Sequence, residues 1–280
     1  MSPLRIAHSP CPNDTFVFHA LTHGLVAGAP PMDVTLADVD VTNTTAHAYD
    51  VVKVSYAALP WLLDDFALLP CGGAVGRGCG PLVLTADERP PEALAGASIA
   101  VPGDRTTAYL LFRLWSRGFT PGRIVVLPFG EIMPAVARGE FDAGLVIHEA
   151  RFTYHRHGLH ALADLGTWWE TDTGLPIPLG AILARRDLPG RAGVGLDALA
   201  GWVRASVEAA WADPSASRAY VLDHAQELEP DVIDAHIALY VNAFTRDLGA
   251  EGHSAAATLL SRAAATGLVP AVTPSALATA

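Results

Sequence analysis

The sequence is poor in lysine: Lys53 is the single lysine among 18 basic residues, and the rest are arginines. Acidic residues number 29, so the formal net charge at neutral pH is −11. Nucleic acids and anionic membranes are bound through clusters of lysine and arginine, which this balance disfavours. We therefore expect no nucleic-acid or membrane partner, and a small molecule as the ligand. Nothing in the sequence indicates an oligomeric state.

Cysteine is also scarce, and long apolar runs are missing. Cys11, Cys71 and Cys79 form no CxxC pair, and an odd number of cysteines in a chain of 280 residues argues against a disulfide framework. The first residues show no basic segment followed by an apolar core, and no later run is long enough to span a bilayer. The sequence therefore predicts a cytoplasmic protein.

Several motifs of cofactor and nucleophile chemistry are missing too. The glycine cluster Gly72–Gly80 lacks the GK[ST] of a P-loop and is followed by a strand-like PLVLT, not by a helix. No GxSxG elbow occurs, and Cys11 lies between two prolines without an assigned base. No HExxH-like metal spacing occurs either, and three clustered histidines are expected on the surface: His155, His157 and His160. We expect no cofactor, no metal and no covalent catalysis.

The middle of the chain alternates between strand-like and helix-like segments. Short apolar runs read as strands, and amphipathic stretches between them read as helices. This βαβαβ order favours a parallel sheet with right-handed crossovers. The expected segments are the strand Ser98–Val101, the helix Thr106–Arg117, the strand Arg123–Leu127, the helix Glu131–Arg138 and the strand Ala143–Ile147.

The two ends of the chain are expected to form a second lobe. A strand over Leu4–Ala7 is followed by a helix that Asn13 or Asp14 caps, and the C-terminal third predicts helices over 196–211, 215–226, 231–244 and 254–266. We predict an α/β fold of two lobes with mainly parallel sheets and a helical C-terminal segment. Lobe 1 is expected to comprise 1–95 and 184–280, lobe 2 to comprise 96–183, and the ligand to lie in the cleft between them.

His148 directly follows the most strand-like run, AGLVI. In open α/β folds ligands bind at the carboxyl ends of strands, and an imidazole exchanges a proton near neutral pH. Two interpretations stay open: His148 is a proton acceptor, or it holds a turn by a hydrogen bond. The roles of the neighbouring Glu149 and Arg151 are undecided.

Lys53 and Ser55 are expected to project side by side, because they are two residues apart on a predicted strand. An ammonium and a hydroxyl together suit an oxyanion. The alternative is structural: Lys53 forms a salt bridge with a neighbouring aspartate, such as Asp38 or Asp40.

Thr106 and Thr107 lie where a helix is expected to begin. A hydroxyl there caps the helix, which contributes about 1 kcal/mol of stability. Hydroxyls and backbone N–H groups at a helix start also suit a carboxylate or a phosphate. Both roles are compatible.

Several segments together resemble the 1,4-dihydroxy-6-naphthoate synthases of the futalosine route to menaquinone. The resemblance extends from about residue 4 to beyond Asn242. It implies a fold similar to type II periplasmic binding proteins. The segments are SPCPNDTFVFHAL, KVSYAAL, GGAVGRGCGPL, VPGDRTTAYLL, GLVIHEARFTY and LPIPLGAILARRDL.

The resemblance also implies a reaction and a set of roles. Cyclic dehypoxanthinylfutalosine, a carboxylate, is converted by a carbon–carbon lyase reaction to 1,4-dihydroxy-6-naphthoate without a redox cofactor. The family's proton acceptor falls on His148. The substrate contacts fall on Lys53, Val54, Ser55, Thr106 and Thr107, and the same segments add Ser9, Asn13 and Arg77 as candidates. Lys53, Arg77 and Arg151 all stay candidates for binding the carboxylate.

Two other functions are weighed against this one. A chorismate dehydratase-like enzyme shares the fold and acts on a carboxylate, but is not expected to combine SPCPNDTF with IHE. A non-catalytic carboxylate-binding protein linked to transport is expected to carry a secretion signal or lipid anchor, and neither is visible.

Overall fold

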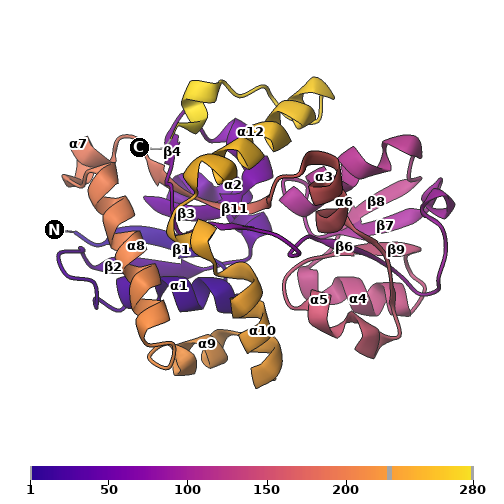
Figure 1. Cartoon of the computed structure of the whole chain (residues 1–280), viewed down its shortest axis with the longest axis horizontal. Coiled ribbons are helices and arrows are strands. Elements are labelled where there is room, and N and C mark those ends of the chain that lie inside the picture. The colour runs from indigo at the N-terminus through magenta and orange to yellow at the C-terminus, as the bar shows by residue number, and fades with distance from the viewer. Residues whose placement is uncertain (1, 226–228, 279–280) are drawn as a thin grey trace.

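The chain forms two lobes, each built around its own β-sheet. The computed structural model describes residues 2–225 and 229–278. The first sheet has the strand order β2-β1-β3-β11-β4, with β5 also paired to β11, and the second has the order β10-β6-β9-β7-β8. Figure 1 shows the first lobe on the left and the second on the right, with segments of chain crossing between them.

Parallel pairs form the core of the first sheet. β1 pairs in parallel with both β2 and β3, and β11 lies antiparallel to β3, β4 and β5. All five residues of β3 are buried, as its apolar run predicts. The bounds are β1 Leu4–His8, β2 Met32–Leu36, β3 Val51–Ser55, β4 Phe66–Leu68, β5 Ala74–Gly76 and β11 Ile177–Arg185.

The second sheet contains the expected βαβαβ unit. β7 pairs in parallel with β8 and with β9, while β6 lies antiparallel to β9 and β10. The order predicted from the middle of the sequence is therefore confirmed. The bounds are β6 Leu82–Thr85, β7 Ser98–Val101, β8 Arg123–Val126, β9 Ala143–Val146 and β10 His160–Asp164.

The limits of the lobes differ from the expected ones. β6 belongs to the second sheet although it precedes residue 95, and β11 belongs to the first sheet although it begins before residue 184. The reason is hydrogen bonding: β6 completes the ladder of β9, and β11 extends that of β3. The chain therefore crosses between β5 and β6, and again just before β11.

Helices cover both sheets, and α8, α9, α10 and α12 form the expected helical C-terminal segment (Figure 1). The expected helix end at residue 226 lies outside the described residues. No described helix combines the length and apolar character needed to cross a bilayer. The bounds are α1 Pro12–Thr22, α2 Val39–Thr45, α3 Thr107–Trp115, α4 Phe129–Ala137, α5 Ala150–Thr153, α6 Leu165–Thr173, α7 Leu188–Ala192, α8 Leu196–Ala212, α9 Arg218–His224, α10 Pro230–Tyr240, α11 Ala243–Arg246 and α12 Gly249–Ala265.

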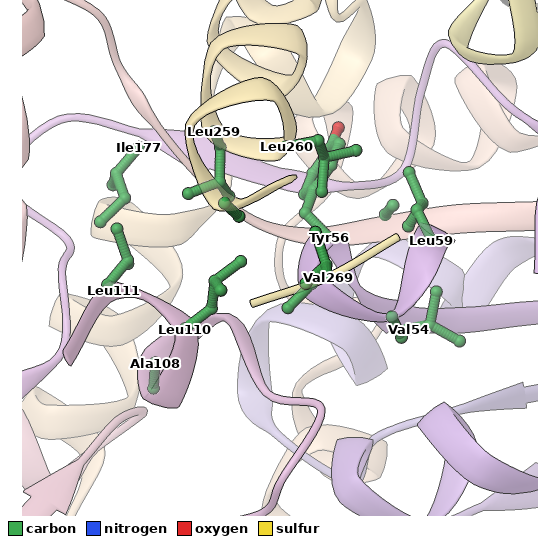
Figure 2. Close-up of a cluster of buried hydrophobic side chains, with 14 of the residues drawn as sticks. Val54, Tyr56, Leu59, Ala108, Leu110, Leu111, Ile177, Leu259, Leu260 and Val269 are labelled. Atoms are coloured by element: carbon green, nitrogen blue, oxygen red, sulfur yellow. The ribbon is translucent and has the colours of Figure 1, made fainter. Parts of the chain in front are cut away.

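One hydrophobic core extends across both lobes. It includes Val52 and Val54 of β3 together with Ile99 and Leu145 of the second sheet. Figure 2 shows where the lobes meet, with side chains of α3 facing side chains of α12 and of the 3₁₀ helix η2 (Tyr56–Trp61). This contact fixes α3, and with it the threonines at its start, against the first lobe. The labelled side chains there include Leu110, Leu111, Leu259, Leu260 and Tyr56.

Candidate active site

His148 lies at the end of β9 in an unusual backbone conformation. Its φ of 56° is the one positive value among the described residues other than glycine. Side chains rarely adopt this left-handed region, and such residues cluster at functional sites. The backbone conformation therefore marks His148 as a candidate functional residue.

The imidazole of His148 is held in the neutral form. Burial lowers its pKa to about 4; the charge of Asp14 opposes this shift, and that of Lys53 adds to it. The Phe129 ring lies edge-on to the imidazole, with ring centroids 5.3 Å apart. A neutral imidazole has a lone pair with which to accept a proton, so His148 has the state that a general base needs.

Lys53 forms a buried ion pair with Asp14. Because β1 and β3 are neighbours, the first turn of α1, which follows β1, lies beside Lys53. Asp14 also accepts hydrogen bonds from the Ser9 hydroxyl at 2.7 Å and from the Asn13 amide at 2.8 Å. The expected salt bridge of Lys53 with an aspartate is therefore confirmed, but the partner is Asp14 and not Asp38 or Asp40.

Gly180 on the adjacent strand β11 and the first turn of α1 both lie beside Lys53. A Cβ on Gly180 would lie 2.9 Å from Lys53 Cε, so a larger residue there would have to displace the end of the lysine side chain. Asn13 and Asp14 do not cap α1, because the helix starts earlier, at Pro12, with Cys11 as N-cap. Proline suits the first position of a helix, and this shifts both polar residues into the first turn.

Asn43 connects Ser55 to the second lobe. Its side-chain oxygen accepts from the Ser55 backbone N–H at 2.7 Å, and its amide donates to Ser55 Oγ at 3.0 Å and to the Arg105 carbonyl at 3.2 Å. Lys53 and Ser55 both line the cavity, as the two-residue spacing predicts. Asn43 thus orients the Ser55 hydroxyl.

Thr106 and Thr107 have different roles at the start of α3. Thr106 is the N-cap, and its hydroxyl accepts from the Tyr109 backbone N–H at 3.3 Å. The Thr107 hydroxyl donates to the Leu179 carbonyl at 2.8 Å and accepts from the Ala57 N–H at 3.2 Å, so it joins the two lobes. The expected capping role is confirmed for Thr106.

An inner and an outer cavity meet at His148, Val39 and Ile147. The inner cavity measures about 70 Å³ and the outer about 420 Å³. The inner wall is mainly apolar, and the outer one includes two carboxylates. The inner polar lining comprises Ser9, Asn13, Asp14, Lys53, Ser55, Thr106, Thr107 and Tyr240. The outer lining includes Asp38, Asp40, Val126, Pro128 and Phe129.

A family model described as menaquinone biosynthesis matches residues 4–265. The chain belongs to this menaquinone-biosynthesis family. A protein of Streptomyces coelicolor is 64% identical over 98% of both chains, and one of Thermus thermophilus is 50% identical over 96% of both. Both relatives are named 1,4-dihydroxy-6-naphthoate synthase. The resemblance seen in the sequence is therefore confirmed, and the chain is similar to proteins named as enzymes.

A solved structure supports the fold that the sequence predicts for this chain. The alkanesulfonate-binding protein of Xanthomonas axonopodis pv. citri, bound to MOPS, superposes with a TM-score of 0.75 over 100% of this chain and 99% of that one. The two sequences are 17% identical, so the likeness concerns the fold alone. The family member has the two-lobed fold of periplasmic binding proteins.

The fold brings most of the candidate residues together around the inner cavity. Two do not line either cavity. Val54 is on the opposite face of β3 from Lys53, and its side chain lies in the hydrophobic core. The Arg77 guanidinium donates to Glu251 at 2.7 Å and to the Gly174 carbonyl at 3.0 Å, and Arg77 lines neither cavity. The candidates that line the inner cavity are Ser9, Asn13, Lys53, Ser55, Thr106, Thr107 and His148.

Arg151 also lines neither cavity. Its guanidinium donates to Asp164 at 2.5 Å and to the Gly80 carbonyl at 2.8 Å. Of the three basic candidates, Lys53 alone lines the inner cavity. The three surface histidines are exposed, as expected.

Sequence reasoning missed His236 of α10, which is fully buried behind the site. Its Nε2 lies 2.9 Å from Asn13 Oδ1, and its ring centroid lies 6.3 Å from that of His148. A hydrogen-bonded chain therefore runs from His236 through Asn13 and Asp14 to Lys53. No local pattern marks His236, because its partners lie near the other end of the sequence.

Replacing His236 with leucine is expected to lower the free energy of unfolding by about 1–3 kcal/mol, because Asn13 Oδ1 loses its buried donor. His236→Gln is the matched control, since its amide restores a donor. Urea denaturation of both variants measures the difference. Equal stability of the leucine and glutamine variants would contradict the assigned hydrogen bond.

Proposed function

We propose that the protein converts cyclic dehypoxanthinylfutalosine to 1,4-dihydroxy-6-naphthoate, as a carbon–carbon lyase with His148 as general base. The observation that carries the proposal is the position of a neutral imidazole where the two cavities meet. A base there reaches a substrate that extends into both. Family membership supports the same pathway.

The sizes of the cavities support a two-part binding mode. Ligand pockets commonly enclose about 300–1,000 Å³, so the inner cavity alone is too small for this substrate. We propose that the ring bearing the carboxylate enters the inner cavity near Lys53 and Ser55, while the sugar-derived part occupies the outer one. The bond to be broken then lies beside His148.

The proposed chemistry requires removal of a proton next to a carbonyl. The imidazole of His148 accepts that proton, and the electron pair it leaves drives cleavage and formation of the aromatic ring. The sugar-derived part departs as a small carbonyl compound, so electrons balance without a redox cofactor. The mainly apolar wall of the inner cavity excludes water from the reacting carbon.

The direct test is to incubate the purified protein with cyclic dehypoxanthinylfutalosine and record the naphthoate absorbance. Chorismate is tested in parallel, because a dehydratase of the same fold is the closest enzymatic alternative. Product from chorismate alone would replace the proposed reaction. Binding of either compound without turnover would favour a carboxylate-binding protein.

Asp38 and Asp40 are proposed to accept hydrogen bonds from the hydroxyls of the sugar-derived part. Asp40→Asn is expected to raise KM about three- to tenfold with little change in kcat, because a neutral amide oxygen accepts a hydrogen bond more weakly than a carboxylate does. Steady-state kinetics measure both constants. Glu88→Gln, a change at an exposed acidic residue outside these two cavities, is the control. An unchanged KM in Asp40→Asn would remove Asp40 from the substrate site.

A further inference from the structure

Three metal-ligating side chains of different chemistry converge at the junction of the lobes. One ligand atom each from Cys11, His148 and Glu149 lies within 4.8 Å of the others. Cys11 is the N-cap of α1 in the first lobe, and the other two residues connect β9 to α5 in the second. The cluster thus joins segments far apart in the sequence, which is why no spacing motif revealed it.

This set of donors suits zinc. Zn²⁺ binds thiolate, imidazole and carboxylate at about 2.0–2.3 Å, so its ligands lie roughly 3.3–3.8 Å apart. The three atoms, which lie within 4.8 Å of one another, must therefore move closer together when the ion binds. Cys11 and Glu149 are buried and His148 is half-buried, so an ion there would be largely shielded from water.

We propose that Cys11, His148 and Glu149 form an inhibitory zinc site that bridges the two lobes. Bound Zn²⁺ occupies the lone pair with which His148 would accept the substrate proton. It also links α1 in the first lobe to the β9–α5 connection in the second, across the site. The Cys11 thiol gives up its proton to solvent when its sulfur binds the ion.

The metal site can be tested without substrate. Co²⁺ is added anaerobically to the metal-free protein, and the near-ultraviolet spectrum is searched for the thiolate-to-cobalt charge-transfer band. We expect the band in the wild type and in Cys71→Ser, because Cys71 lies in the core of the first lobe and bonds to the Ala200 carbonyl. We expect Cys11→Ser to lack it. No band in the wild type, or a band that persists in Cys11→Ser, would overturn the proposal.

A second measurement covers the other two ligands. Competition with a chromophoric chelator gives the Zn²⁺ dissociation constant, which is expected to rise at least tenfold in Glu149→Gln and in His148→Asn. Equal Zn²⁺ affinity of the wild type and both variants would overturn the proposal. Because these readouts need no turnover, they stay valid even if the proposed reaction fails its own test.

Discussion

His148→Asn is expected to lower kcat by a factor of about 10² to 10⁴, the usual contribution of a positioned general base. KM should change by less than about tenfold, since the base acts mainly in the transition state. Asparagine is the sharpest replacement, because it tolerates the left-handed backbone conformation that His148 adopts. Steady-state kinetics with the naphthoate absorbance as the readout measure both constants.

His148→Ala serves as a comparison that separates chemistry from backbone strain. Alanine at a positive φ costs about 1–2 kcal/mol of stability, whereas asparagine should be tolerated. Both variants should lose activity equally while differing in thermal stability. If the asparagine variant turned over substrate at near the wild-type rate, His148 would not be the base.

The pH dependence of activity follows from the neutral state of His148. Because its pKa in the folded protein is about 4, the imidazole stays unprotonated as the pH falls below 6.5. Activity should therefore persist below pH 6.5 and decline as pH 4 is approached. In the unfolded chain His148 has an ordinary histidine pKa near 6.5, so between pH 6.5 and pH 4 the unfolded chain binds more protons than the folded protein. The free energy of unfolding should therefore decrease as the pH is lowered from 6.5 to 4. An acid limb of kcat/KM centred near 6.5 would contradict the assigned burial effect.

Lys53→Met is expected to lower the free energy of unfolding by about 3 kcal/mol, because it leaves the Asp14 carboxylate buried without its cation. The loss falls at the low end of the usual range, since Ser9 and Asn13 still donate to Asp14. Substrate affinity should fall at least tenfold, because Lys53 is the basic candidate at the inner cavity. Urea denaturation and calorimetry measure the two effects.

The double variant Lys53→Met/Asp14→Asn distinguishes a structural from a binding role. Removing both charges should restore most of the stability, since no charge is then buried alone. Substrate affinity should stay low. Recovery of affinity together with stability would mean that Lys53 acts only as the partner of Asp14.

Local patterns were sufficient to predict part of this site. His148 follows an apolar strand, and Lys53 and Ser55 obey the two-residue period of a strand, so each is visible within a few residues of sequence. The partners depend on the fold instead. Asp14 meets Lys53 only because β1 and β3 are neighbours, and Arg77 is directed away from the cavity by a carboxylate on α12.

The same distinction applies to the lobes. The alternation of strands and helices within the βαβαβ unit is local, and it was predicted correctly. The sequence did not predict which sheet β6 joins, because the apolar run of a buried strand looks the same whichever sheet it belongs to. Hydrogen-bond partners far along the chain decide that choice.

The hydrophobic core shared by the lobes limits how relatives of this protein can diverge. Leu110 and Leu111 of α3 lie where Leu259 and Leu260 of α12 approach (Figure 2). Removing the second lobe would therefore expose apolar surface on the first lobe, and the separated second lobe would expose apolar surface too. Recombination that exchanged the second lobe between relatives would have to preserve the apolar side chains of α3 and those of α12 that they contact. New substrate ranges are therefore expected to arise from point substitutions along the cavity walls, not from shuffling whole lobes.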